Sequence, residues 1–558
     1  MIVKMRHMDL ICIAREREAT LERLRELGIV HLDLNASSGT AVQQAKGEAA
    51  AAEEAVRLVR KIRGKGKGGE AALTASDVLD LGRKLAALEN DLEKCTRELR
   101  ALEPYGDFDP ELAAKLLEKV ENLREIVALP PVLPARRMKD VIAEKASIEA
   151  KIAQVKAEIA DVDEKRILAD YPALEDAIAF EQAKELLTEH GEVSVISGWV
   201  PATKEALLWN EVRRSEASSL FARAKSLGWG LLVRDAVEGE VPPTLIEPPR
   251  IFRPMKALFA GLGIAPAYTE SDVSVPFMCY FSVFFAMLVG DGAYGLIFLI
   301  GTLLMRKKLP GSWFALLSVF SLATVVWGVL SNTWFGAQIP YLASLPTVSW
   351  LADPSYKNMM FLCFTIGVSH LMLARVWNAI CRLPDSTALA EFGWAGVLLF
   401  MYLVTNSIVG IFTGGVPVWG FWVFGVSIAL LFLFTVKPRE FKTRGAELGM
   451  LPLNIMSALG DIISYVRLFA VGLASVKVAE NFNSMALGLI GPDKEFWVNA
   501  LMAVAMAAIL LVGHGLNLAM AGLSILVHAV RLNTLEFSNH KGVTWSGLAF
   551  GAFTRKAK

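Results

Sequence analysis

Apolar runs of membrane length recur through the second half of this 558-residue chain, from about Val275 onward. A bilayer-spanning helix needs about 20 predominantly apolar residues, and runs of this length with short gaps between them indicate several such helices. The first half, up to about residue 254, is rich in charged residues and has the pattern of soluble helices. The chain is therefore predicted to be a soluble domain over residues 1–254 followed by an integral membrane domain over residues 255–558.

The composition supports this division. Hydrophobic residues make up 54% of the chain and the mean hydropathy is +0.42, which is more apolar than an ordinary soluble protein. The formal net charge of zero argues against a nucleic-acid binder. The 5 cysteines lack CxxC or CxH spacing, so we expect no metal site, no disulfide framework and no cofactor. The amino terminus lacks a signal-peptide pattern, so the soluble half is expected in the cytoplasm.

The soluble half is predicted to hold a small α+β unit at its start and a second α+β unit that closes the base of a helical hairpin. Met8–Ile13 has the short apolar pattern of a strand, Glu16–Leu27 is an amphipathic helix, and Ile29–Leu32 is expected to form a second strand. Val193–Pro201 alternates like a further strand and belongs to a second globular unit at about residues 185–240.

Between these units, at about residues 40–165, two apolar seams recur at helical spacing with charged residues between them. This pattern predicts an antiparallel coiled-coil hairpin whose tip is a Pro-containing insert at about residues 104–134. A plain helical bundle would show the same spacing, and both alternatives are architecture rather than chemistry. The seam residues are Leu81, Leu85, Leu88, Leu92, Cys95, Leu99 and Leu102, and then Ile148, Ile152, Val155, Ile159 and Val162.

The membrane half is predicted to contain eight helices. Val275–Met305 is interrupted by the glycine-rich stretch Gly290–Gly295 and is expected to form a hairpin of two short helices. Within this stretch, Asp291 is interpreted as a turn and capping residue. The clear spans lie near residues 313–335, 358–381, 390–412, 416–436, 448–489 and 496–537.

Charged loops predict the orientation of these helices. The basic segments Arg306–Lys308, Lys437–Arg444 and Arg555–Lys558 should be cytoplasmic, whereas the nearly uncharged loop Gly336–Tyr356 should lie outside. Because the soluble half and Arg306–Lys308 lie on the same side, the hairpin between them must cross an even number of times. We expect a multi-pass protein with both termini in the cytoplasm.

Arg467 lies near the middle of the apolar stretch 448–489, with apolar residues for several turns on both sides. A guanidinium at the centre of a bilayer helix costs roughly 2.5–3.5 kcal/mol on insertion scales, so it normally has a partner and a function. This stretch and the next are each about 42 residues long, roughly 60 Å as helices, so both must be steeply tilted or broken.

Polar residues form stripes along these two last helices, with steps of three and four residues. Such a stripe is either a hydrated path or a set of interhelical hydrogen bonds, and its histidines and arginines favour a path. His370 and Glu391 lie in other spans and fit a structural bond or an access route equally well. The first stripe contains Asn454, Ser457, Asp461 and Ser464 and leads to Arg467. Another polar run beyond the arginine contains Lys477, Glu480 or Asn481, and Ser484, and the stripe of the second helix contains His514, Asn517, Ala521, Ser524, His528 and Arg531.

Together these motifs resemble the large membrane subunit of V/A-type rotary ATPases, called subunit a or subunit I. The specific part of the resemblance is Ser464–Ala474, which contains Arg467, paired with His528–Leu532, which contains Arg531. The other segments that match are Gly290–Gly295, Trp327–Gly328, Phe335–Gly336, Ile196–Pro201 and Pro242–Thr244, so the resemblance covers nearly the whole chain.

The resemblance implies a stator beside a rotating proteolipid ring, with a cytoplasmic domain bound to peripheral stalk subunits. It implies that Arg467 faces the essential carboxylate of the ring, with Arg531 and His528 beside it, and that the other polar residues of the two stripes line ion half-channels. Central-stalk and nucleotide-binding subunits are the further partners. Ala521 and Ser475 replace the acid and the histidine expected in eukaryotic relatives, which favours a prokaryotic member in a cell membrane.

Two other classes of function stay open from the residues alone. A secondary ion transporter with a coiled-coil regulatory domain should show two related halves, and we see no such internal repeat. A membrane-anchored scaffold would not need intramembrane arginines. No GxxxxGK[ST] motif occurs, so we expect no catalytic site for ATP in this chain. The sequence leaves open whether the ion is H⁺ or Na⁺ and whether the complex makes or hydrolyses ATP.

Overall fold

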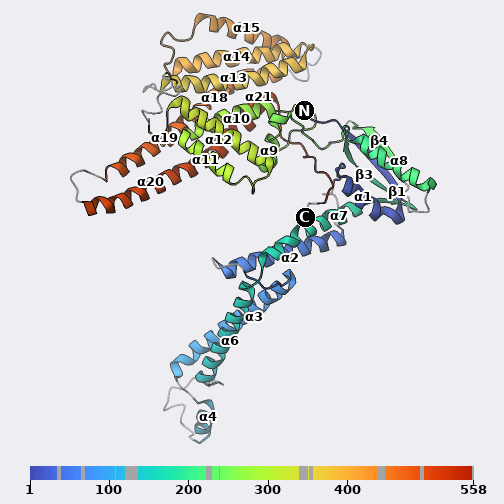
Figure 1. The fold of residues 1–558 in the computed structure, drawn as a ribbon, viewed down its shortest axis with the longest axis vertical. Coiled ribbons are helices and arrows are strands. Elements are labelled where there is room, and N and C mark those ends of the chain that lie inside the picture. The colour runs from blue at the N-terminus through green and yellow to red at the C-terminus, as the bar shows by residue number, and fades with distance from the viewer. Residues whose placement is uncertain are drawn as a thin grey trace. The chain divides into compact units, whose positions relative to one another are not determined.

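The computed structural model describes residues 1–33, 39–64, 69–106, 109–119, 136–221, 229–237, 239–337, 348, 350, 356–436, 446–489 and 496–555. The chain divides into two compact units (Figure 1). The hydrophilic unit consists of Met5–Ala236 and Gly551–Lys558, and the membrane unit consists of Met1–Lys4 and Val237–Phe550. Each unit is described by itself.

A four-stranded antiparallel sheet forms the globular part of the hydrophilic unit, in the order β2-β3-β1-β4. Alternate residues of the long strands face the core, so Leu10 of β1 and its partner Ile196 of β3 are both fully buried. The strand predicted at Val193–Pro201 is confirmed as β3. The strands are β1 (Met5–Ile13), β2 (Thr188–His190), β3 (Val193–Pro201) and β4 (Gly230–Asp235).

The helix predicted at Glu16–Leu27 is confirmed as α1 (Arg17–Leu27), and Gly28 ends it in the left-handed region at φ +60°. The second strand predicted at Ile29–Leu32 is wrong, because only His31 forms an isolated bridge, to Trp199. The run is too short to extend a ladder, and its apolar side chains are buried in the core of the unit instead.

The stalk of the hydrophilic unit consists of paired helices (Figure 1). Helices α3 and α6 run antiparallel. Glu89 of α3 pairs with Lys156 of α6 at 2.8 Å, and Glu98, later in α3, pairs with Arg136, just before α6, at 3.4 Å. The hairpin itself stays a prediction, because residues 107–108 and 120–135 of its expected tip lie outside the described residues. The helices are α2 (Thr40–Arg63), α3 (Ala75–Leu102), α4 (Pro110–Lys119), α6 (Met138–Ala160) and α7 (Glu164–Glu185), and α8 (Glu205–Phe221) follows β3.

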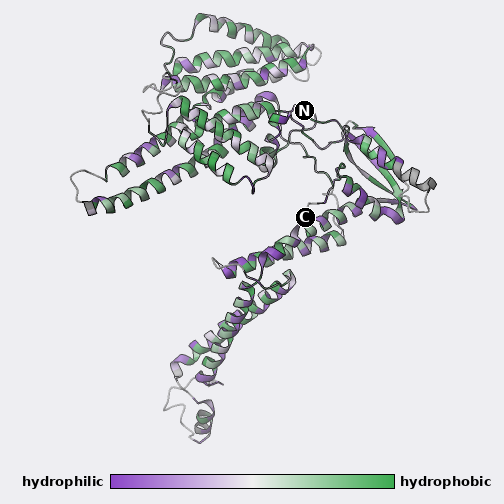
Figure 2. Ribbon diagram, in the orientation of Figure 1, coloured by the Kyte–Doolittle hydropathy of each residue, from purple (hydrophilic) through white to green (hydrophobic). Residues whose placement is uncertain are grey.

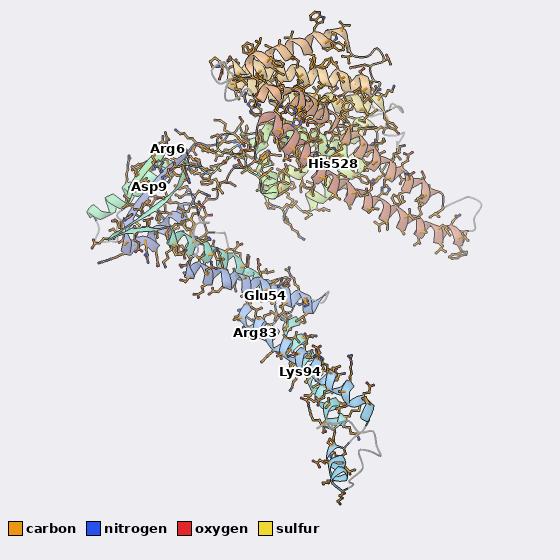
Figure 3. The ribbon with its side chains drawn as sticks, turned by 180° about the vertical axis from the view of Figure 1, so that it is seen from behind. Arg6, Asp9, Glu54, Arg83, Lys94 and His528 are labelled. Carbon is orange, nitrogen blue, oxygen red and sulfur yellow. The ribbon has the colours of Figure 1, made fainter. Side chains whose placement is uncertain are left out.

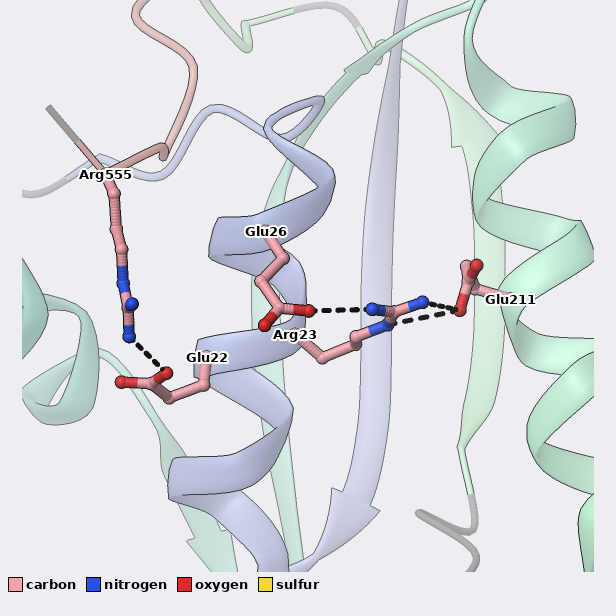
Figure 4. A network of polar contacts seen from close by, with 5 residues as sticks. All are labelled: Glu22, Arg23, Glu26, Glu211 and Arg555. Carbon is pink, nitrogen blue, oxygen red and sulfur yellow. Dashed lines mark hydrogen bonds and ion pairs between the residues drawn. The ribbon is translucent and has the colours of Figure 1, made fainter. Parts of the chain in front are cut away.

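The end of the chain returns to the hydrophilic unit and completes its core. Phe553 is buried, and its backbone N–H donates to the carbonyl of Val30 at 2.8 Å. Arg555 pairs with Glu22 at 2.7 Å, beside Arg23, which bridges Glu26 and Glu211 (Figure 4). Nothing in the sequence pattern indicated this return.

The membrane unit is almost entirely helical and mostly apolar (Figure 2). Among the described residues, five helices are long and apolar enough to cross a membrane, and α10 and α11 form a further pair bent by 119°. The count of eight spans stays a prediction. The helices are α9 (Met255–Leu262), α10 (Ser274–Val289), α11 (Gly292–Leu304), α12 (Gly311–Ser331), α13 (Lys357–Arg382), α14 (Thr387–Ile408), α15 (Val418–Phe434), α17 (Ala446–Gly449), α18 (Leu451–Ile463), α19 (Val466–Leu487), α20 (Phe496–Ser524) and α21 (Ser538–Lys541).

The bend between α10 and α11 is built around Asp291, which is fully buried. One carboxylate oxygen accepts the backbone N–H of Ala293 at 2.8 Å, and the other accepts that of Gly336 at 2.7 Å. The predicted capping role is therefore confirmed. Glycine is required beside it, because a Cβ on Gly328 would lie 2.1 Å from the Cα of Gly292. This close approach packs α11 against α12.

Candidate functional site

Arg467 lies in the first turn of α19, just after the short break at Ser464 and Tyr465 that separates α18 from α19. Its side chain is 25% exposed, and Nη2 is 3.7 Å from Oε1 of Glu536. The Nε atom of Arg531 is 3.4 Å from the same oxygen. The two arginines predicted from sequence therefore share one carboxylate, which balances part of their charge.

Glu536 was missed by the sequence interpretation. The helix after α20 contains two π-helical segments, η8 (Ile525–Ala529) and η9 (Leu532–Phe537). Such segments place residues five apart on one face and occur frequently at functional sites. Glu536 is five residues after Arg531. A stripe counted in steps of three and four residues therefore does not include it. The signal that would have found it is a carboxylate inside the apolar run 496–537.

His528 lies within the π-helical segment η8, three residues before Arg531, among the helices of the membrane unit (Figure 3). Its Nδ1 atom is buried and has no hydrogen-bond partner among the residues that the structure describes. Ser524 is one turn earlier on the same helix. His528 lies close enough to Arg467 and Arg531 to interact electrostatically with both, and the predicted roles of His528 and Ser524 stay untested.

His514 and Asn517, at the start of the second stripe, form interhelical hydrogen bonds. His514 contacts the hydroxyl of Tyr294 at 2.7 Å through Nδ1 and Oδ1 of Asn483 at 3.0 Å through Nε2. Asn517 donates to Tyr294 at 3.1 Å and to the carbonyl of Ser475 at 2.8 Å. For these residues the structural reading of the stripe explains the contacts fully.

Two cavities border α18 and α19, and Arg467 comes between their lining residues along the chain. The inner cavity, about 550 Å³, is lined by α18 residues up to Asp461, and the outer cavity, about 570 Å³, by α19 residues from Leu468 onward. Predicted residues lining the inner cavity are Asn454, Ser457 and Asp461. Those lining the outer cavity are Lys477, Glu480 and Ser484.

Ser464 and Asn481 are among the lining residues of neither cavity in the described part of the chain. Ser464 instead donates to the carbonyl of Gly460 at 3.0 Å within its own helix. Lys477 and Glu480, in the wall of the outer cavity, form an exposed ion pair at 2.6 Å. The polar run before Arg467 and the polar run after it therefore contribute to two different cavities.

His370 and Glu391, which the sequence left open, have different environments. His370 is fully buried, bonds the hydroxyl of Tyr465 at 2.8 Å and stacks on Phe537 with ring centroids 4.4 Å apart, so it packs helices together. Glu391 pairs with Arg375 at 3.1 Å and with Arg382 at 2.9 Å. Arg375 lines the inner cavity, whereas Glu391 is not among the described residues that line it.

Comparison with known proteins now bears on this arrangement. No family model matches the chain. A V-type ATP synthase subunit I of Borreliella burgdorferi is 29% identical and a V-type ATP synthase subunit I 1 of Treponema pallidum 28% identical, each over 100% of both chains. An A-type ATP synthase subunit I of Methanocaldococcus jannaschii is 24% identical over 81% of this chain and 71% of that relative. The chain is similar over its whole length to subunit I of V-type ATP synthases.

This full-length similarity confirms the resemblance stated on the paired arginine motifs. The relatives are subunits I of V-type and A-type ATP synthases, and the chain, like a membrane subunit, has several helices apolar enough to cross a membrane. All of the relatives named here come from bacteria or archaea, as expected for a prokaryotic member. The individual roles of Arg467, Arg531 and His528 stay predictions.

Proposed function

We propose that this subunit is the stator of the membrane sector and that Arg467 is the fixed charge facing the carboxylates of a rotating proteolipid ring. The observation that carries the proposal is the arrangement along α18 and α19. Along these two helices, the residues that line one cavity end before Arg467 and those that line the other begin after it, and a carboxylate, Glu536, lies 3.7 Å from the guanidinium.

Physical chemistry supports this role for an arginine. A ring carboxylate that travels through lipid must be protonated or neutralised by a cation, because a bare charge is expensive there. Meeting a fixed guanidinium favours its ionised form, so the ion is released into one cavity, and the site reloads from the other. Arginine stays charged throughout, and its charge also opposes direct passage of cations between the cavities.

The surface of the two long helices supports a ring as the partner. Only 11% of the most apolar window of Trp497–Lys541 is buried within the molecule, against 56% for Thr387–Ile408. A proteolipid ring offers the apolar surface that such a face requires. The exposed apolar residues on this face and on α18 include Leu453, Met456, Ile463, Leu511, Val512, Leu516, Met520, Leu523 and Val527.

The stalk of the hydrophilic unit displays charged side chains along its length, among them Glu54, Arg83 and Lys94 (Figure 3). We propose that it binds peripheral stalk subunits, with the central stalk and nucleotide-binding sector completing the complex. Both termini are proposed to be cytoplasmic. The basic loop Lys437–Arg444 and most of the loop Gly336–Tyr356, on which that orientation depends, lie outside the described residues.

Purification from the native membrane tests the proposal against a secondary transporter. A stator should copurify with a proteolipid ring and a nucleotide-binding sector, and vesicles containing the complex should take up H⁺ or Na⁺ when ATP is added. Uptake with each cation alone identifies the ion. A subunit that purifies alone and transports without ATP would support the transporter instead.

A further inference from the structure

The chain departs from regular α-helix just before Arg467. The backbone N–H of Tyr465 donates to the carbonyl of Ile462 at 3.1 Å, and that of Arg467 donates to the carbonyl of Ser464 at 3.3 Å. Both bonds span three residues rather than four, so the break between α18 and α19 has the spacing of a 3₁₀ turn. Such a turn within a long helix often marks a functional hinge. The direction in which the Arg467 side chain points therefore depends on what holds this hinge.

Tyr465 is the buried residue of the hinge, and its side chain is fully enclosed within the membrane unit. Its hydroxyl is 2.8 Å from Nδ1 of His370, on α13. One turn earlier on α13, Gly367 leaves room for the tyrosine ring, because a Cβ there would lie 2.5 Å from the Cγ atom of Tyr465. Gly367 and His370 thus form a slot that receives Tyr465, which we call the α13 slot.

His370 also contacts the segment that carries Glu536. Its ring stacks on Phe537 of η9, with centroids 4.4 Å apart and planes 12° apart, and on Tyr280 of α10 at 4.1 Å. Two rings cannot stack on the same face, so the imidazole is held between them. Phe537 directly follows Glu536 in the chain. One side chain of α13 therefore holds the backbone next to both members of the ion pair between Arg467 and Glu536.

Stacking alone does not explain a histidine at this position. His370 is fully buried and is not among the described residues that line either cavity. Its Nε2 atom has no hydrogen-bond partner in the part of the chain that the structure describes. A phenylalanine would stack as well and would bury no unpartnered nitrogen. What the imidazole adds is its bond to Tyr465, in the hinge.

We propose that the α13 slot positions Arg467: by binding Tyr465 it fixes the hinge, and with it the rotation of the guanidinium about the axis of α19. This inference rests on the proposed stator function. A residue in 3₁₀ geometry turns the chain by about 120° and one in α geometry by about 100°, so each hinge residue that relaxes to α geometry rotates Arg467 by about 20°. That rotation changes the separation of Arg467 from Glu536, which is 3.7 Å in the structure.

The test measures how many ions are taken up per ATP hydrolysed by the complete ATPase in vesicles, with the cation, H⁺ or Na⁺, that the complex transports. This ratio does not depend on how many complexes assemble, so a loss of stability alone leaves it unchanged. His370→Phe keeps the stacks and Tyr465→Phe keeps the ring, but both lose the hydrogen bond. Each should lower the ratio about tenfold, because a displaced guanidinium no longer opposes passage of ions between the cavities.

The matched control is Tyr402→Phe. Tyr402, on α14, also bonds a residue of α13, since its hydroxyl is 2.9 Å from that of Thr365. Losing this hydroxyl removes a bond between membrane helices away from the hinge, so the ratio of ions to ATP should stay normal. A tenfold loss in Tyr402→Phe would show that any such bond matters equally and would overturn the special role of the α13 slot.

Two further comparisons test the slot itself. If His370 and Tyr465 act through their shared bond, the double Phe variant should lose about tenfold, like either single variant, and not the about 100-fold of independent effects. A 100-fold loss would overturn action through the bond. Gly367→Ala forces the tyrosine ring from the slot and should also lower the ratio. Gly425→Ala, on α15, places its Cβ in open space and should not.

The outcomes separate this inference from the function on which it rests. A normal ratio in Tyr465→Phe or in Gly367→Ala, with Arg467→Ala inactive, would overturn the positioning role and leave the stator function standing. Coupled pumping by Arg467→Ala would overturn the stator function itself. Tyr465→Phe removes a single oxygen atom, so it decides the question even where His370→Phe does not assemble.

Discussion

The helix pair α3 and α6 and the helix pair α19 and α20 have opposite arrangements of polar and apolar residues. In the first pair, Leu85, Cys95 and Ile152 are buried along the seam and the charged residues face outward. In the second, Asn517 and Ser475 are buried and bonded between the helices, while leucines such as Leu511 are exposed. The spacing of three and four residues is the same in both pairs.

The difference follows from the solvent that each pair is built for. In water, burying an apolar seam drives helices together, at about 25 cal/mol per Å² of apolar surface. In lipid that driving force is absent, and an interhelical hydrogen bond contributes only about 0.6 kcal/mol on average. A polar seam in a membrane therefore adds little stability, and its charged members need a functional explanation. Substitutions in the two pairs should affect different properties.

The largest effect is expected at Arg467. Arg467→Ala removes the fixed charge, and Arg467→Lys keeps a charge but loses the planar group with several donors, so both should abolish ATP-driven ion uptake. The alanine variant should also leak when an ion gradient is imposed, because the barrier between the cavities is gone. Arg531→Ala, at a residue that is 53% exposed, should be milder. Uptake in reconstituted vesicles measures all three, and coupled pumping by Arg467→Ala would contradict the assignment.

A smaller effect is expected at Glu536, the carboxylate shared by both arginines. Breaking a buried ion pair costs about 3–5 kcal/mol, and the lower figure applies because Arg467 is partly exposed. In Glu536→Gln, Arg467 should hold each ring carboxylate more tightly, so ATP hydrolysis and ion uptake should slow together by about 100-fold. No passive leak should accompany the loss. A leak with normal hydrolysis would show that Glu536 seals the path instead.

Arg467 was predictable from sequence because a charge inside a long apolar run is conspicuous without any knowledge of its neighbours. Glu536 was not, because two π-helical segments change the spacing on which the prediction depended. His370 and Tyr465 are 95 residues apart, and no periodicity relates them. The strand expected at Ile29–Leu32 failed for a similar reason, since local pattern cannot show whether a partner strand lies within reach.

The stalk pair should respond in stability and not in transport. Ile152 is 7% exposed in the seam, so Ile152→Ala removes buried methyl groups and should destabilise the stalk by about 2–4 kcal/mol. Ile142, on the same helix, is 46% exposed, and the same substitution there should cost less than about 1 kcal/mol. Hydrogen exchange of α6 in the full chain measures both. Equal losses of stability in Ile152→Ala and Ile142→Ala would contradict the burial of Ile152 in the seam between α3 and α6.

The smallest effect is expected at the first turn of α3, and it should change the stability of the pair α3 and α6 without changing transport. The hydroxyl of Thr74 accepts the N–H of Asp77 at 3.3 Å, while the Asp77 carboxylate accepts the N–H of Thr74 at 3.0 Å. Thr74→Ala should weaken local protection of α3 by about 0.5–2 kcal/mol, because water replaces the lost acceptor. Thr96→Ala, inside the helix, should have almost no effect. Hydrogen exchange of the first turn distinguishes the two variants.

The effect at Thr74 should depend on pH with a definite sign. The hydrogen bonds to Thr74 lower the pKa of Asp77 in the folded chain. Because the pKa of Asp77 is lower in the folded chain than in the unfolded chain, where it is about 3.9, the ionised carboxylate stabilises the folded chain at pH values above about 3.9. This stabilisation is lost as the pH falls through the pKa of the folded chain. The difference between Thr74→Ala and the unaltered chain should therefore be full at neutral pH and shrink in acid. A difference that stays constant from neutral pH down to about pH 2 would show that the Asp77 carboxylate plays no part in the cap. At the start of α11, where Asp291 is fully buried, water cannot replace the acceptor, so the corresponding loss there should be larger.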